Sequence, residues 1–307
     1  MIAAPLYDDL ERIPEGGQAY WRTASDGLRI RTAVWRSGGD KTVLILPGRT
    51  EFIEKYGSVI LQLLRRNYSV AIIDWRGQGL SERHATKRDL GWVKDFSEYQ
   101  FDVAELLATA RDTGLPDLFA MIGHSMGGCI GLRSLMDGLP IKKVIFSGPM
   151  WGIYVEPKMR IPAAIIARIG PFLGFGEKFV PSGSEDYYVL TEPFESNVLT
   201  NDQDQYEILK HQLQTHPDLG LGGPSLQWFN RALIETKKLV VDAPAKQDCL
   251  CLLGTEEAIV SVPAIKDVMA KWPNGKLVEV PNAHHEVLME GRAQLELVWS
   301  EIDTHLA

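Results

Sequence analysis

The chain has 307 residues, of which 45% are hydrophobic and 23% are charged, and its formal net charge is −8. This length and apolar fraction fit one large α/β domain with an insertion, and they argue against a disordered chain. The acidic balance, with no cluster of lysine and arginine, argues against a nucleic-acid partner.

The amino terminus and the cysteines bear on where the protein works. Residues 1–15 contain no basic stretch followed by an apolar run, so we expect no cleaved export signal and a cytoplasmic protein. Cys249 and Cys251 alternate along one apolar run, and Cys129 lies one helical turn past Ser125. We therefore interpret all three as small core residues of a protein in a reducing compartment. No second cysteine pair or histidine pair lies at ligand spacing, so we expect neither a disulfide nor a metal site.

In chain order, predicted strands alternate with predicted helices. Alternating or short continuous apolar runs predict strands at residues 28–35, 43–46, 70–73, 118–122, 144–146, 249–253 and 276–280. Helical spacing predicts helices at residues 52–66, 96–113, 126–137, 262–271 and 291–306. This alternation is typical of a mostly parallel sheet that is covered on both faces and connected by right-handed crossovers.

The alternation breaks in one central stretch, where helical runs cover residues 161–175, 202–215 and 226–237. We therefore divide the chain into an α/β core, residues 1–149 and 244–307, and a helical cap, residues 150–243. Because the cap follows the strand after the 126–137 helix, we expect it to lie over the carboxyl edge of the sheet and to roof a site there.

The run at 161–175 is too short to span a bilayer, which needs about 20 apolar residues, and Pro162, Gly170 and Pro171 interrupt it. We favour a helix packed on its neighbours over a lid that touches the membrane. Peripheral contact of the cap with the inner face of the membrane stays open as the alternative.

The segment from Gly123 to Gly127 joins a predicted strand to a predicted helix, with Ser125 at its centre. This is the context of the G-x-S-x-G nucleophile elbow, in which a sharp turn exposes the serine hydroxyl beside a helix amino terminus. We therefore expect Ser125 to be a catalytic nucleophile.

A serine nucleophile needs a base and an acid, which in this architecture follow it in the order acid, histidine. His285 follows the last predicted strand and is the expected base, with His284 as its rival. His124 lies beside Ser125 in sequence, but neighbours in a sharp turn face differently, so we expect it to pack near the elbow. The loop after the penultimate strand provides Glu257 as the expected acid and Glu256 as the next candidate.

The oxyanion of the reaction needs two N–H donors. One is expected from the backbone of Met126, and the other from Arg49 in the loop after an early strand, where Gly48 lets the backbone come close. The Arg49 side chain is then free to meet solvent, a substrate anion or Glu51.

Four segments, residues 74–81, 123–128, 254–260 and 283–288, together resemble the α/β-hydrolases of the lysophospholipase and monoacylglycerol lipase group. Residues 47–51, followed by Lys55 and Tyr56, resemble the bacterial lysophospholipase branch, which has proline-glycine-arginine where monoacylglycerol lipases have histidine-glycine. The resemblance implies an α/β-hydrolase fold with the cap inserted after the sixth core strand. This sequence departs from the family pattern at Glu257, where the family usually has aspartate.

The resemblance and the triad order imply a carboxylic ester hydrolase that cleaves lysophospholipids or monoacylglycerols through an acyl-enzyme on Ser125, without a cofactor. We expect apolar cap residues, with Trp151, Ile165 and Phe172 among them, to bind the acyl chain. The alternatives are an aminopeptidase-like enzyme or a short-chain carboxylesterase of the same fold and, less favoured, a non-catalytic ligand-binding homologue. The sequence indicates no oligomeric state.

Overall fold

The computed structural model describes residues 1–241 and 245–307, which form a nine-stranded sheet in the order β1-β2-β3-β5-β4-β6-β7-β8-β9. The strands are β1 (Ile2–Ala3), β2 (Gln18–Thr23), β3 (Arg29–Trp35), β4 (Lys41–Leu46), β5 (Tyr68–Asp74), β6 (Asp117–His124), β7 (Lys143–Ser147), β8 (Asp248–Gly254) and β9 (Gly275–Val280). Strands β4 to β9 pair in parallel, whereas β1, β2 and β3 are antiparallel. The expected mostly parallel sheet is confirmed, and β1 and β2 are additions that the apolar pattern did not reveal.

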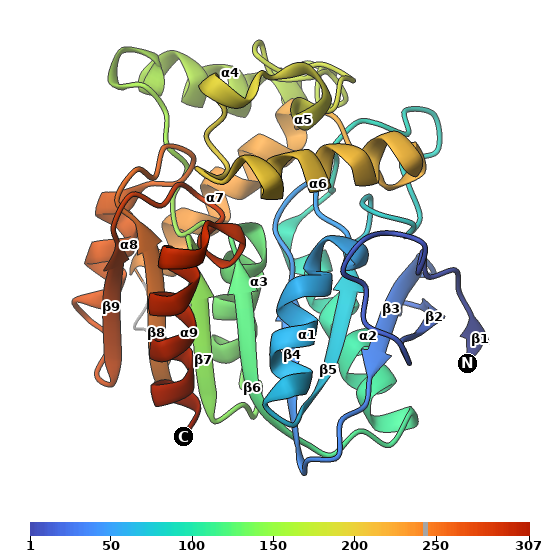
Figure 1. Ribbon diagram of the computed structural model, residues 1–307. Coiled ribbons are helices and arrows are strands. Elements are labelled where there is room, and N and C mark those ends of the chain that lie inside the picture. Colours follow the sequence, from blue (N-terminus) through green and yellow to red (C-terminus); the bar gives the residue numbers. More distant parts are fainter. Residues whose placement is uncertain (242–244) are drawn as a thin grey trace.

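Helices cover both faces of this sheet, as Figure 1 shows for α1 and α9 in front and α2 and α3 behind. The core helices are α1 (Gly57–Arg65), α2 (Tyr99–Asp112), α3 (Met126–Met136), α8 (Val262–Met269) and α9 (Arg292–Leu306). The strand period of two separates the two faces: Val43 and Ile45 pack with α1 and α9, whereas Leu44 and Leu46 pack with α2, α3 and α8. Single-turn 3-10 helices are η1 (Ile53–Tyr56), η2 (Phe96–Glu98), η3 (Pro157–Met159), η4 (Phe194–Ser196), η5 (Pro217–Leu219) and η6 (Val287–Met289).

The predicted insertion is helical and lies above the carboxyl ends of the parallel strands (Figure 1). Its helices are α4 (Arg160–Phe172), α5 (Tyr188–Thr191), α6 (Gln203–Thr215) and α7 (Leu226–Val241). It follows β7, which is the sixth strand of the chain when the two-residue β1 is left out. The predicted boundary between residues 243 and 244 lies outside the described residues. α7 joins the two parts, because Trp228, Ala232 and Leu239 pack into the same core cluster as α2 and α3.

The prolines of the 161–175 run do not break its helix. Pro162 lies in the first turn of α4, where an N–H has no acceptor within the helix, and Pro171 is the residue before the last, so its missing N–H removes one hydrogen bond at the end of the helix. Among the described helices, none has the length and apolar content that crossing a bilayer requires.

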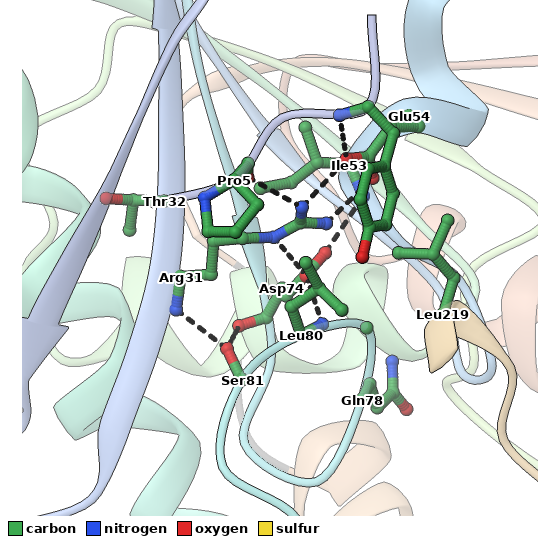
Figure 2. A network of polar contacts seen from close by, with 12 residues as sticks. Pro5, Arg31, Thr32, Ile53, Glu54, Asp74, Gln78, Leu80, Ser81 and Leu219 are labelled. Atoms are coloured by element: carbon green, nitrogen blue, oxygen red, sulfur yellow. Dashed lines mark hydrogen bonds and ion pairs between the residues drawn. The ribbon is translucent and has the colours of Figure 1, made fainter. Parts of the chain in front are cut away.

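A buried ion-pair network fixes the loop after β5 against the rest of the core (Figure 2). Arg31 of β3 donates to Asp74 at 2.7 Å and to both carboxylate oxygens of Glu54 at 2.7 Å. Asp74 also accepts from the backbone N–H groups of Ile53, at 2.9 Å, and Leu80, at 2.8 Å. The network therefore joins β3, η1 and the turn that follows β5, whose sequence contributed to the family resemblance.

Candidate active site

Ser125 lies at the sharp turn between β6 and α3, with φ 49° and ψ −117°. A serine rarely adopts positive φ, and strained residues of this kind are typical of functional sites. The turn leaves Ser125 at the carboxyl edge of the sheet, directly before the amino terminus of α3, where the helix dipole stabilises negative charge.

Close packing explains the glycines around this turn. A Cβ at Gly123 would lie 3.0 Å from the Gly127 carbonyl oxygen, and one at Gly128 would lie 2.6 Å from the Cβ of Pro149. A Cβ at Gly127 would overlap the carbonyl group of Leu46. The elbow therefore needs these glycines for space rather than for backbone conformation, because none of the three has positive φ.

His285 and Glu257 come from the loops after β9 and β8 and meet beside the elbow. The Nδ1 atom of His285 lies 2.7 Å from Oε2 of Glu257, and the other oxygen of Glu257 accepts from the N–H groups of Ile259 and Val260. Burial alone would raise the pKa of Glu257, but His285 and these hydrogen bonds lower it below its ordinary value. The carboxylate is thus held ionised, and the His285 Nε2 atom is left to accept a proton.

The neighbouring candidates pair elsewhere. His284 Nε2 lies 3.0 Å from Glu256 Oε2, and the Glu256 side chain is 48% exposed. His124 Nδ1 lies 2.9 Å from the Ser147 carbonyl oxygen, and burial lowers the pKa of His124 to about 4. His124 therefore packs near the elbow as a neutral imidazole, as the sequence predicts.

The two expected oxyanion donors have free N–H groups. Met126 is the first residue of α3, where an N–H has no acceptor within the helix. Across residues 1–241 and 245–307, the Arg49 N–H has no acceptor either. The Gly48 N–H, in contrast, donates to Glu51, and Gly48 is buried and outside the cavity lining, so the structure does not support a direct contact of Gly48 with substrate.

The cap holds part of the Arg49 side chain, and within the described residues this side chain forms no hydrogen bond or ion pair with Glu51. Its Nη2 atom donates to the Gly222 carbonyl oxygen at 2.5 Å, and its guanidinium lies 5.3 Å from the centre of the Trp228 ring. The cap thus covers this side chain, since Gly222 and Trp228 both belong to it.

A buried charged cluster, Glu51, Lys55 and Glu286, was missed at the sequence level. Lys55 Nζ lies 2.6 Å from Glu51 and 2.5 Å from Glu286, and all three side chains are less than a tenth exposed. Glu51 also accepts from Gly48 and from the Tyr56 hydroxyl. The cluster links the oxyanion loop to the loop of His285.

The charges in this cluster are set by burial and by the lysine. Burial alone would raise the pKa of Glu51, but Lys55, His124 and Tyr56 lower it to about 2. Burial would lower the pKa of Lys55, but the two glutamates raise it. For Glu286, burial outweighs Lys55 and the pKa is raised. One sequence feature could have revealed part of this cluster. Glu51 and Lys55 are four residues apart, the spacing of a helical ion pair, and both lie in a segment that resembles the bacterial lysophospholipases.

Ser125, His285 and Arg49 line a cavity of about 960 Å³ between the core and the cap. Much of its wall is apolar and comes from the cap, with Ala163 and Ile166 of α4, Leu209 and Leu213 of α6 and Phe229 of α7. This volume is at the upper end of the range for small-molecule sites. Within the described part of the chain, no group of three or more histidine, cysteine or carboxylate side chains has the arrangement of a metal site.

The three cap residues expected to bind the acyl chain do not line this cavity. Trp151 is fully buried in the core, where its Nε1 donates to the Gly128 carbonyl and its ring contacts Phe146 and Trp272. Ile165 is 52% exposed and Phe172 is 90% exposed, on the outer side of α4. The prediction failed because apolar composition does not reveal which side of a two-faced helix points inward.

Comparisons with known proteins add to this geometry. Residues 39–292 match the model of a family described as serine aminopeptidase, S33. The lysophospholipase L2 of Escherichia coli strain K12 is 28% identical over 293 residues, covering 88% of this chain and 84% of that protein. A probable lysophospholipase L2 of Haemophilus influenzae is 27% identical over 252 residues, covering 81% and 78%. A solved structure of a soluble variant of monoglyceride lipase from Saccharomyces cerevisiae, in complex with a substrate analog, has a TM-score of 0.75 at 19% identity and covers 98% of this chain and 99% of that one.

Proposed function

The chain belongs to the serine aminopeptidase S33 family of α/β-hydrolases, and from this premise we propose that it is a serine hydrolase that cleaves carboxylic esters of lipid-like substrates. The observation that carries the proposal is the meeting of three parts at one cavity. They are Ser125 on its strained turn, the His285 and Glu257 pair, and the free N–H groups of Arg49 and Met126.

In the proposed mechanism the Ser125 oxygen attacks the ester carbonyl while His285 Nε2 takes the hydroxyl proton. Glu257 holds the other imidazole N–H and stabilises the imidazolium. The N–H groups of Arg49 and Met126 stabilise the tetrahedral oxyanion. His285 then protonates the departing alcohol, which leaves the acyl group on Ser125. Water, deprotonated by His285, attacks the acyl-enzyme and releases the carboxylic acid.

The lipid-like substrate is supported by the cavity wall. A long acyl chain needs an extended apolar surface, and the cap provides one with Ile166, Leu209, Leu213 and Phe229. The names of the relatives, lysophospholipase L2 and monoglyceride lipase, agree with esters of this class. In this proposal residues 150–243 act as the lid of the acyl-binding site.

An aminopeptidase-like activity is the second candidate, since the family description names it. Its substrate carries a positively charged amino terminus, and two carboxylates of the cap, Asp186 and Glu192, line the cavity. Glu185, the third acidic residue of this region, does not.

We further propose that the outer face of α4 contacts a membrane surface. Its exposed apolar residues, Ile161, Ile165, Ile169, Phe172 and Leu173, repeat at helical spacing and form one stripe. Residues 157–176 contain three basic residues, Lys158, Arg160 and Arg168, and no acidic one, in a chain of net charge −8. An apolar stripe flanked by cations fits an anionic lipid surface. α4 lies at the far side of the cap from the sheet (Figure 1).

A substrate panel tests the proposal. Purified protein is assayed with a lysophospholipid, a monoacylglycerol, p-nitrophenyl esters of short and long acids, and aminoacyl amides, and its serine is labelled with a fluorophosphonate probe. We expect cleavage of long-chain esters, and labelling that Ser125→Ala abolishes. Labelling that persists in Ser125→Ala contradicts the nucleophile assignment. Cleavage of the amides in preference to all esters favours the aminopeptidase reading.

A further inference from the structure

Arg49 is a partly buried cation at the cavity, and no carboxylate of the described residues forms an ion pair with it. Within residues 1–241 and 245–307 its guanidinium makes one hydrogen bond, to the Gly222 carbonyl, and it lies over the Trp228 ring. Its Nε atom is inaccessible to solvent and has no hydrogen-bond partner. Burial lowers the pKa of Arg49 to about 10, which leaves it charged at neutral pH. A guanidinium has five N–H donors, so most of its capacity is unused.

Three other buried or partly buried arginines have more hydrogen-bond partners than Arg49. Arg31 donates to two carboxylates and to the Pro5 carbonyl, as Figure 2 shows. Arg76 pairs with Asp26 and Asp102. Arg83 has no carboxylate partner, but its Nη2 donates to the carbonyl groups of residues 79, 218, 219 and 220.

Among the residues that line the cavity, Lys55 is the other lysine or arginine, and Glu51 and Glu286 neutralise it. A partly buried charge without a counter-ion loses part of its hydration, and an anion brought by a ligand would offset that loss. Arginine is also well suited to phosphate, because its planar fork can donate two parallel hydrogen bonds to phosphate oxygens.

We propose that the Arg49 side chain binds the phosphate of the substrate head group, so that the site selects lysophospholipids over neutral monoacylglycerols. This inference rests on the proposed ester hydrolase function. The main chain of Arg49 holds the ester oxyanion in that mechanism, so its side chain starts beside the scissile bond. In a lysophospholipid the glycerol backbone places the phosphate only a few bonds from that ester, within reach of the same residue.

Binding of ether lipids tests this without catalysis, since they have no ester to cleave. Dissociation constants for 1-O-hexadecyl-lysophosphatidylcholine and 1-O-hexadecylglycerol are measured by calorimetry below their micellar concentrations. In Arg49→Gln we expect affinity for the phosphate-bearing lipid to fall at least about tenfold more than affinity for the neutral one, as for a lost hydrogen bond to a charged group. Arg49→Lys keeps the charge and should retain part of the preference.

Arg83→Gln is the matched control, because Arg83 also holds the cap segment 218–220 but does not line the cavity. It should change the two dissociation constants by the same factor. If Arg49→Gln behaves in the same way as this control, Arg49 only holds the cap and the inference is overturned. Should Arg49→Gln fail to fold, competition on the wild type decides. Glycerol 3-phosphate at millimolar concentration, but not glycerol, should displace the neutral ether lipid, and equal behaviour of the two competitors refutes phosphate binding.

The two proposals fail separately. A wild type that cleaves none of the esters in the panel contradicts the hydrolase function, whatever the ether lipids show. A wild type that cleaves esters, but whose preference for the phosphate-bearing lipid survives in Arg49→Gln, contradicts the role of Arg49 alone.

Discussion

At the scale of single residues, two adjacent histidines pair with two adjacent glutamates. His284 lies 3.0 Å from Glu256 and His285 lies 2.7 Å from Glu257. The Glu257 side chain is fully buried and the Glu256 side chain is half exposed. Of the two histidines, His285 lines the cavity with Ser125. Burial and position, which differ between the pairs, therefore favour His285 and Glu257 for catalysis.

The outer pair provides matched controls for the inner one. We expect His285→Ala to lower kcat by about 10⁴-fold or more, because the base of a triad acts in every chemical step. Glu257→Gln should lower kcat somewhat less, and His284→Ala and Glu256→Gln should stay within about threefold of the wild type. Steady-state kinetics on a soluble ester measure all four. A larger loss of kcat in His284→Ala than in His285→Ala would show that His284, and not His285, is the base.

Lys55 should matter for both stability and turnover. In Lys55→Met the carboxylates of Glu51 and Glu286 remain buried without their cation, so we expect the free energy of unfolding to fall by about 3–5 kcal/mol. Because Glu51 also holds the Gly48 N–H beside the oxyanion loop, kcat should fall while KM changes little.

The double variant Lys55→Met with Glu286→Gln restores the net charge of this cluster and serves as the control for Lys55→Met. It should recover part of the lost stability in urea unfolding. A double variant less stable than Lys55→Met would show that charge balance is not what Lys55 provides.

At the scale of elements, α4 has two apolar faces with different surroundings. Ala163 and Ile166 line the cavity, whereas Ile161, Ile165 and Phe172 lie exposed on the outer side. α4 also packs closely on α7, since a Cβ at Gly170 would lie 2.9 Å from Leu226. A single helix can therefore serve the acyl site with one face and a membrane surface with the other.

Substitutions of Ile166 and Ile165 test the inner and the outer face of α4 separately. We expect Ile166→Asn to lower kcat/KM for a long-chain ester about tenfold more than for a butyrate ester, because only the long chain loses apolar contact with α4. Ile165→Asn should leave the ratio of the two kcat/KM values unchanged. The assay compares p-nitrophenyl palmitate with p-nitrophenyl butyrate, and equal losses for both esters in Ile166→Asn would rule out an acyl-binding role for the inner face.

The outer face is tested by vesicle co-sedimentation. The wild type should bind vesicles that contain phosphatidylglycerol more strongly than pure phosphatidylcholine vesicles, because Arg160 and Arg168 flank the stripe. Phe172→Ser should weaken this binding several-fold, since it removes a ring that is 90% exposed, while the hydrolysis of a monomeric butyrate ester stays unaltered. If Phe172→Ser and the wild type bind the vesicles equally, the outer face of α4 does not contact the membrane.

At the scale of the whole molecule, arginines hold distant segments together. Arg31 joins β3, η1, the turn after β5 and the amino-terminal segment through the Pro5 carbonyl. Arg49 and Arg83 donate to carbonyl groups of the cap between residues 218 and 222. The end of the cap near η5 is thus tied to the core, whereas α4 lies at the far side of the cap from the sheet (Figure 1) and carries exposed apolar residues.

Arg31→Met should be among the more destabilising single changes in the core. It leaves two buried carboxylates, Glu54 and Asp74, without their shared cation, so we expect a loss of about 3–5 kcal/mol in the free energy of unfolding. Arg29→Met is the control, because Arg29 is exposed on the same strand, and it should cost about 0.5 kcal/mol or less. Chemical denaturation of both variants measures the difference, and similar losses would show that the Arg31 pairs add no stability.

Local sequence patterns were enough to predict the mostly parallel sheet, the chain order of its strands and helices, the helical cap and the serine elbow. These features depend on local patterns, namely apolar periodicity and the glycines around Ser125, which a chain displays before it folds. Chain order also narrowed the candidate base and acid to two adjacent histidines and two adjacent glutamates, because the loops after successive parallel strands meet at the same edge of the sheet.

Which side chains face the cavity depends on how distant segments pack. Ile165 and Ile166 are adjacent, equally apolar and similarly exposed, at 52% and 40%, but only Ile166 of the two lines the cavity. Lys55 and Glu286 are 231 positions apart, so no local pattern could have paired them. Trp151 is as apolar as a lipid-binding residue would be, yet the space between Phe146 and Trp272 holds it in the core. Composition and spacing record what a residue is, whereas its neighbours are set by how distant segments pack.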